Sequence, residues 1–174
     1  MDLQQILEHA GRFYPHRTAV VCGTTQFSYR GLTERVHRLC HALHGLGIAK
    51  GDRLAILMFN CHRYFELYYA TPHTGTLAVP LNVRLSASEI AYILKDSGSN
   101  TLFVGAEFLP LLAEIRDQLP ALQHCIFTGE GQPPEGFHSY EHLLEAAPAD
   151  FPPTAVAPED LAALFYTSGT TGHP

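Results

Sequence analysis

Residues Arg53–Phe59 read RLAILMF, and the last six of these seven side chains are apolar. A strand with one face in water alternates apolar and polar side chains, whereas a parallel strand buried on both faces is apolar throughout. The preceding triplet, Lys50–Gly51–Asp52, is a turn sequence, because glycine and aspartate favour turn conformations. The stretch therefore predicts a central strand of a parallel sheet.

Strand-length and helix-length patterns alternate after this strand. Further apolar runs lie at residues 77–81, 101–104 and 124–127, and helical periodicity fills residues 61–70, 86–96 and 107–119. We expect Asn60 to cap the first of these helices and Pro72 to end or kink it. Ser86 and Glu89 form a capping-box pattern at the start of the second. The alternation predicts an α/β fold, with a mainly parallel sheet and helices on both of its faces.

The flanking sequence predicts smaller elements. A helix closed by Pro15, a β-hairpin around Gly23–Thr25 and a helix over Tyr29–Leu46 precede the strand. A short helix follows near residues 140–147, and four prolines then favour an extended connector. We therefore divide the chain into an α/β subdomain (1–147), a proline-rich connector (148–160), and a strand with a truncated phosphate-binding loop (161–174).

Composition excludes several classes of protein. A net charge of -6 argues against binding to nucleic acid or to an anionic membrane, since both need a basic face. No apolar run approaches the roughly 20 residues of a membrane span, and no basic segment precedes an apolar stretch at the N-terminus. The four cysteines are scattered in apolar runs without metal-site spacing. We expect a cytoplasmic protein without a transmembrane segment.

The last nine residues, Tyr166–Pro174, read YTSGTTGHP directly after an apolar run. Phosphate oxygens need several converging donors, which glycine-rich backbone N–H groups and Ser/Thr hydroxyls supply. The spacing matches neither the Walker phosphate loop nor the dinucleotide fingerprint. By composition alone, a flexible Ser/Thr/Gly tail fits as well, so the order of the residues has to decide.

That order resembles the phosphate-binding signature of the adenylate-forming superfamily, the AMP-binding enzymes that include acyl-CoA synthetases, luciferases and peptide-synthetase adenylation domains. Residues 27–57 and 74–104 are similar to the two N-terminal modules of this family, so the resemblance covers the whole chain. Asn82 favours an acyl-CoA synthetase, such as a fatty-acid–CoA ligase, because peptide-synthetase domains more often carry aspartate there. The resemblance implies the N-terminal subdomain of the adenylate-forming fold, in incomplete form.

The sequence departs from the family pattern at Gly31 and at Thr71–Thr74. Gly31 stands where the family often has a glutamate that completes a capping box with Ser28. We therefore expect the start of the helix after Ser28 to be weaker by about 1 kcal/mol.

The resemblance also implies a reaction. Such enzymes attack the α-phosphate of ATP with a carboxylate, release pyrophosphate, and pass the acyl group from the acyl-adenylate to coenzyme A. ATP, Mg²⁺, coenzyme A and a small-molecule carboxylate are the implied ligands of the complete enzyme, with the Mg²⁺ ligands outside this chain. The implied binders of the β- and γ-phosphates are Thr167, Ser168, Gly169, Thr170, Thr171 and Gly172.

No residue of this chain is assigned a catalytic role by the resemblance. The lysine of the loop, the adenine and acyl pockets and the adenylation lysine are expected beyond Pro174, so we expect the 174-residue chain alone to be inactive. Two alternatives stay open. One is a stand-alone, non-catalytic protein-association module derived from this fold, and the other is part of a peptide-synthetase adenylation domain.

Two further groups of side chains receive structural interpretations. His37, Cys40, His41 and His44 have spacings that a helical metal site could use. The three histidines lie opposite the apolar stripe of their helix, so we interpret them as a solvated polar face and assign no metal ligand. We interpret the aromatic-rich run Arg63–Tyr69 as the packed face of a core helix.

Overall fold

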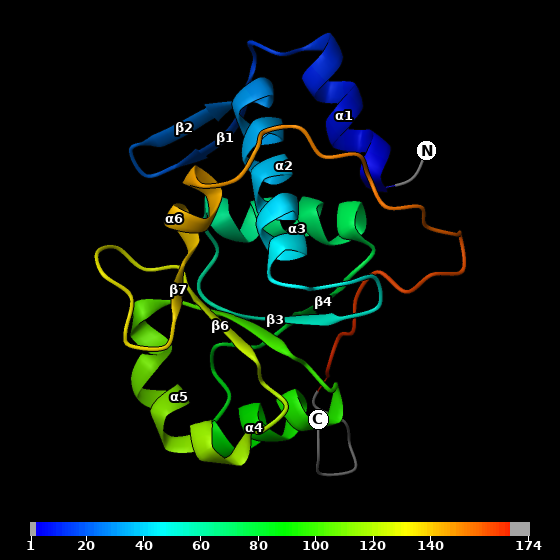
Figure 1. Ribbon diagram of the computed structural model, residues 1–174. Coiled ribbons are helices and arrows are strands. Elements are labelled where there is room, and N and C mark those ends of the chain that lie inside the picture. Colours follow the sequence, from blue (N-terminus) through cyan, green and yellow to red (C-terminus); the bar gives the residue numbers. More distant parts are fainter. Residues whose placement is uncertain (1–2, 168–174) are drawn as a thin grey trace. The chain divides into compact units, whose positions relative to one another are not determined.

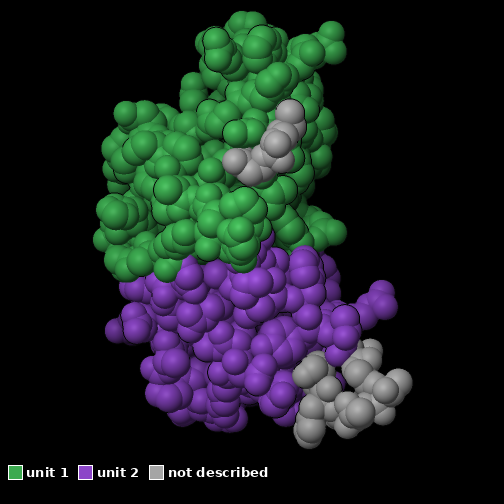
Figure 2. Space-filling model, turned by 90° about the vertical axis from the view of Figure 1, so that its right-hand side faces the viewer, with its two compact units in different colours: residues 1–50, 60–76, 141–160 green, residues 51–59, 77–140, 161–174 purple. Residues whose placement is uncertain are grey.

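The computed structural model describes residues 3–167, and these form helices and strands in alternation over much of the chain (Figure 1). The elements group into two units, shown in different colours in Figure 2. Unit 1 comprises residues 1–50, 60–76 and 141–160, and unit 2 comprises residues 51–59, 77–140 and 161–174. The division of the chain at residues 148–160, which the proline content suggests, stays a prediction.

Unit 2 is built on a five-stranded parallel sheet in the order β4-β3-β5-β6-β7. Its strands are β3 (Arg53–Leu57), β4 (Leu77–Pro80), β5 (Thr101–Val104), β6 (His124–Phe127) and β7 (His138–Ser139). The predicted α/β class and the central place of the RLAILMF strand are confirmed, because β3 pairs with a neighbour on each side. The two-residue strand β7 was not predicted, since so short a stretch carries no periodicity.

Helices α4 (Ala87–Asp96) and α5 (Leu109–Ile115) lie along the sheet of unit 2 (Figure 1). Alternate strand positions face the same side of a sheet, and here they meet the apolar sides of both helices. The cluster includes Ala55, Leu57, Leu102, Val104, Ile90, Leu94, Leu112 and Ile115. All eight side chains are nearly inaccessible to water.

The helix predicted over residues 107–119 is broken in the structure. A 3₁₀ turn at Ala106–Phe108 precedes α5 and another at Arg116–Gln118 follows it. Pro110 has no N–H and is tolerated only in the first turn of a helix, so α5 begins at Leu109.

Helix α4 has the capping box that the sequence predicts. Ser86 N donates to Glu89 Oε2 at 2.8 Å, and Glu89 N donates to Ser86 Oγ at 3.4 Å. At its other end, the Arg53 guanidinium donates to the carbonyls of Ser97 (2.9 Å) and Gly98 (2.7 Å). The first residue of β3 therefore binds the exposed carbonyls that terminate α4.

Unit 1 contains the longest helices of the described chain. They are α1 (Leu3–Phe13), α2 (Tyr29–Gly45) and α3 (His62–Thr74). The unit also contains the hairpin of β1 (Thr18–Cys22) and β2 (Thr25–Ser28), and most of α6 (Tyr140–Glu145). The predicted apolar stripe of α2 is confirmed, since Leu32, Val36, Leu39 and Leu43 are fully buried. No described helix is long and apolar enough to cross a bilayer.

The predicted cap of α3 is wrong, and so is the prediction that Pro72 ends the helix, whereas a kink at Pro72 stays a prediction. The residue that caps it is Cys61 rather than Asn60, and its side chain makes no capping bond. Pro72 does not end the helix, which continues to Thr74 and terminates where Gly75 turns left-handed at φ 69°. Because Pro72 lies in the last turn, its missing N–H costs a single helical bond, and His73 Nδ1 bonds the Tyr69 carbonyl there at 2.7 Å.

A group of four charged side chains joins α2, α3 and α6 within unit 1. Arg35 contacts Glu66 at 2.6 Å and Glu141 at 3.0 Å, and Arg63 contacts Glu141 at 2.7 Å. The Glu66 side chain has no exposed surface. A buried carboxylate is tolerated only when it is paired, and Arg35 is an ion-pair partner of Glu66.

We expect Arg35→Met to destabilise the protein by about 3–5 kcal/mol, because it removes an ion-pair partner of the buried Glu66 carboxylate. Urea unfolding followed by circular dichroism measures the change. The double variant Arg35→Met/Glu66→Leu is the control, and it should recover much of the loss. Equal losses in the single and double variants would show that the ion pair is not the cause.

We expect Gly31→Glu to stabilise α2 by about 1–2 kcal/mol, through helix propensity and a completed capping box. Gly31 N already donates to Ser28 Oγ at 3.2 Å. A Cβ at Gly31 would lie at ordinary contact distance, 3.7 Å from Ser28 Oγ. Thermal unfolding measures the gain, and Gly31→Ala isolates the propensity contribution. If the alanine and glutamate variants are equally stable, no capping box forms.

Candidate functional site

The described part of the C-terminal segment, residues 161–167, leads into the predicted phosphate-binding loop. Ala163 forms a parallel bridge with Ala78 of β4. Ala78 N donates to the Ala162 carbonyl at 3.1 Å, and Leu164 N donates to the Ala78 carbonyl at 2.9 Å. The segment therefore adds to the outer side of β4, but the strand predicted here is reduced to one bridge.

Side chains fix this segment beside α4. Leu164 and Tyr166 pack against the apolar cluster of unit 2, whereas Phe165 between them is 68% exposed. The Tyr166 hydroxyl donates to Asp96 Oδ2 at 2.6 Å. Burial, with the Asp96 hydrogen bond and charge, raises the pKa of Tyr166 to about 12. Tyr166 therefore stays protonated and holds the chain one residue before Thr167.

Of the predicted phosphate-binding residues, the structure places Thr167 alone. Thr167 is exposed, so its hydroxyl is accessible to a ligand. Ser168, Gly169, Thr170, Thr171 and Gly172 lie outside the described residues, and their role stays a prediction. The predicted phosphate-binding role of Thr167 therefore stays a prediction as well.

The interpretation of the α2 histidines as a solvated face is wrong for His37. His44 is exposed, but the His37 side chain is only 14% exposed and its Nε2 lies 2.6 Å from Glu8 Oε1 of α1. Burial raises the pKa of Glu8, but hydrogen bonds and charge from His37 and then His73 bring it below its ordinary value. A helical wheel of α2 does not show that α1 covers its second face.

The interpretation of the aromatic run as a packed helix face is wrong for Phe65 and Tyr68. Their exposed fractions are 38% and 41%. The buried side of α3 is formed instead by His62, Glu66, Leu67 and Ala70. The charged Glu66 could not have been placed inside from sequence, because its burial depends on Arg35 of another helix.

Comparison with protein families gives one match across almost the whole chain. The family model described as AMP-binding enzyme matches residues 7–174. A 3-hydroxybenzoate–CoA/4-hydroxybenzoate–CoA ligase of Thauera aromatica is 34% identical over 158 residues, which are 91% of this chain and 30% of the relative. A long-chain-fatty-acid–CoA ligase of Thermus thermophilus is 36% identical over 180 residues, covering 100% of this chain and 32% of the relative.

Solved structures also match this chain over almost its whole length. An anthranilate CoA ligase in complex with anthranoyl-AMP superposes with a TM-score of 0.95 and 31% identity, over 100% of this chain and 33% of that one. A fatty acyl CoA synthetase of Mycobacterium tuberculosis gives a TM-score of 0.85 and 32% identity, over 99% of this chain and 33% of that one. The chain thus spans about a third of the length of these relatives.

We expect Asp96→Asn to lower the pKa of Tyr166 from about 12 toward its ordinary value of 10.0, because the substitution removes a negative charge beside the phenol. Titration of ¹³Cζ-labelled tyrosine by NMR measures the change. Tyr64, whose pKa is raised to about 12 by burial and by Tyr68, is the internal control and should not move. An unchanged Tyr166 would show that Asp96 does not accept its hydrogen bond in solution.

Proposed function

Because the chain belongs to the AMP-binding enzyme family, we propose that it is the N-terminal part of an AMP-forming acid–CoA ligase. The family match over residues 7–174, which takes in the YTSGTTGHP motif, is the observation that carries the proposal. Curated relatives over 30% identical are CoA ligases with acids as different as hydroxybenzoate and long-chain fatty acids. The proposed substrate is accordingly a small-molecule carboxylate, activated as the acyl-adenylate and transferred to coenzyme A.

In this proposal the loop residues position ATP. The backbone and hydroxyl donors of residues 167–172 hold the β- and γ-phosphates while the α-phosphate is attacked. Holding a leaving group in line and stabilising its charge are positioning and electrostatic roles, and neither moves a proton. Mg²⁺ and coenzyme A belong to the proposal for the whole protein, with the Mg²⁺ ligands outside residues 1–174.

Leu161 and Phe165 of the C-terminal segment are 65% and 68% exposed. In the proposed ligase other segments of the longer protein cover these side chains, whereas an association module would use them to bind its partner. The four cysteines are free thiols, which fits the proposed cytoplasmic location.

We expect the purified 174-residue chain to form no acyl-adenylate from ATP and a panel of benzoates and fatty acids. Pyrophosphate exchange measures the reaction. Protein expressed from the whole coding sequence should catalyse the exchange and release the acyl group to coenzyme A. Acyl-adenylate formation by the 174-residue chain would overturn the expected inactivity. Transfer to a carrier-protein thiol in place of coenzyme A would favour a peptide-synthetase domain.

The loop assignment has its own test in that longer protein. Thr170→Val should lower kcat/KM for ATP by about 10²-fold, which is the usual cost of one lost donor at developing charge. Thr24→Val, in the turn between β1 and β2, is the matched control and should leave the rate unchanged. Equal rates in both variants would contradict the phosphate-binding role of Thr170.

A further inference from the structure

Three side chains from three helices converge inside unit 1. Glu8 Oε1 of α1 lies 2.6 Å from His37 Nε2 of α2 and 3.1 Å from His73 Nε2 of α3. The potential ligand atoms of this cluster all lie within 4.8 Å of one another. His73 is fully buried, His37 is 14% exposed and Glu8 is 42% exposed. The cluster is thus closed on the histidine side and open at the carboxylate.

The other nitrogen of each imidazole fixes the hydrogen positions. His73 Nδ1 lies 2.7 Å from the Tyr69 carbonyl, and His37 Nδ1 lies 3.2 Å from the Ala149 carbonyl. A carbonyl oxygen only accepts, so both Nδ1 atoms carry a hydrogen. In the neutral imidazoles, both Nε2 lone pairs then point at the carboxylate oxygen. Three lone pairs in one place repel each other unless a positive charge lies among them.

We propose that Glu8, His37 and His73 bind a divalent transition-metal ion, with Zn²⁺ as the best match. One ion satisfies all three lone pairs, whereas protons have to occupy both Nε2 atoms and charge the fully buried His73. Imidazole nitrogen with one carboxylate is a ligand set of Zn²⁺, and Mg²⁺ and Ca²⁺ prefer oxygen alone. This inference is independent of the proposed ligase function.

The surroundings match those of metal-bound histidines. Such histidines usually donate their second N–H to a carbonyl or a carboxylate, which orients the ring, and both Nδ1 atoms do so here. Tetrahedral Zn²⁺ with bonds of about 2.1 Å places its ligand atoms roughly 3.3 Å apart. The Glu8–His37 and Glu8–His73 separations of 2.6 Å and 3.1 Å lie close to that spacing, and the third separation is within 4.8 Å.

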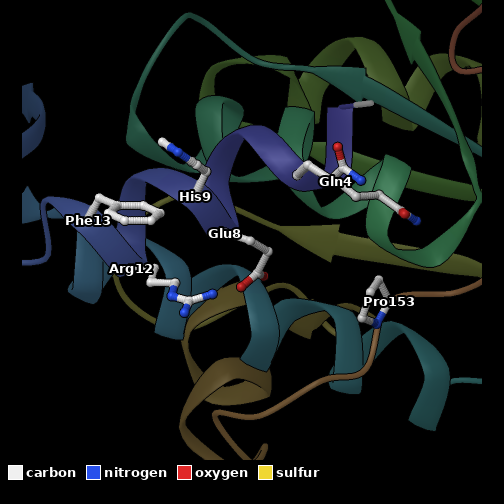
Figure 3. Close-up of a pocket in the computed structure, with 7 residues that line it drawn as sticks. Gln4, Glu8, His9, Arg12, Phe13 and Pro153 are labelled. Carbon is white, nitrogen blue, oxygen red and sulfur yellow. The ribbon is translucent and has the colours of Figure 1, made fainter. Parts of the chain in front are cut away.

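The carboxylate end of the cluster lies at a surface hollow. Glu8 lines a hollow of about 570 Å³ together with Gln4, His9, Arg12, Phe13 and Pro153. Figure 3 shows Glu8 and Arg12 extending from one side of α1, with His9 on the other. A second hollow at Glu8 is lined by Arg12, Arg30 and Glu34. The guanidinium groups of Arg12 and Arg30 repel a cation, and the Glu34 carboxylate balances the charge of one of them. A water molecule and not a second carboxylate therefore completes the proposed site.

A bound ion would attach α1 to α2 and α3. The contacts of α1 also include the buried Leu7 and Gln4 Nε2, which donates to the Pro72 and Thr154 carbonyls at 2.8 Å each. Cys40 of α2 is no competing ligand, because burial raises the pKa of its thiol above the ordinary value. The ion is therefore expected to stabilise the fold without thiolate ligation.

The test is calorimetric titration of the EDTA-treated 174-residue chain with ZnCl₂ at about pH 7. One equivalent should bind, and Tm should rise by about 5–10 °C at a hundredfold excess over Kd. Binding should weaken as the pH falls, because protons compete for the imidazoles. Co²⁺ should give the visible bands of a nitrogen–oxygen site, without an intense thiolate band. MgCl₂ should give no heat.

His37→Gln and Glu8→Gln should each raise Kd by more than about 100-fold, since losing an outer-shell partner alone costs about 10- to 100-fold. His44→Gln, an exposed histidine two turns further along α2, is the matched control and should bind as the parent does. No Zn²⁺ binding by the parent chain, or equal losses in the His37 and His44 variants, overturns the proposal. If the variants do not fold, anomalous diffraction at the zinc edge of parent crystals decides, and a peak away from the three side chains refutes the site.

Discussion

The parallel pairing of β3 with β4 and β5 is the constraint on which the rest of the fold depends. Neighbouring parallel strands cannot be joined by a tight turn, so a longer crossover connection has to join them. The connection between β3 and β4 contains α3, and the connection between β4 and β5 contains α4. Helix α3 belongs to unit 1 and α4 to unit 2, so both units are assembled from non-contiguous segments. Arg53, at the start of β3, also binds the carbonyls that end α4.

Those parts of the fold that local chemistry determines could be predicted from the sequence. The continuous apolar run of β3 and the capping box at Ser86 each depend on residues close together in the chain. Predictions failed where a distant or competing group decides. Asn60 has the right side chain for a cap, but the helix begins one residue later, after Cys61. Pro110 is tolerated only in the first turn of a helix, so residues 107–119 do not form one continuous helix despite their periodicity.

The two candidate sites also differ in how much of each can be predicted from the sequence. The phosphate-binding role proposed for residues 167–172 could be predicted because these residues form a contiguous motif, whose order is informative without any structure. Glu8, His37 and His73 are separated by 29 and 36 positions and come from three helices, so no spacing rule brings them together. The sequence suggests His37 as a metal ligand only together with Cys40, His41 and His44 of α2. The true partners lie on α1 and α3, and only tertiary packing identifies them.

The two units are held together internally by different forces. Unit 2 rests on one apolar cluster between sheet and helices, which is indifferent to pH. In unit 1, ion pairs and close polar contacts connect the helices, through Arg35 with Glu66 and Glu141 and through Glu8 with its two histidines. Burial raises the pKa of Glu141, but Arg35 and then Arg63 bring it below its ordinary value. A carboxylate with a lowered folded-state pKa contributes stability above its unfolded pKa and loses it as the pH falls through the folded value. Acid therefore weakens the helix contacts of unit 1 while the apolar core of unit 2 is unaffected, because only the first depends on charge.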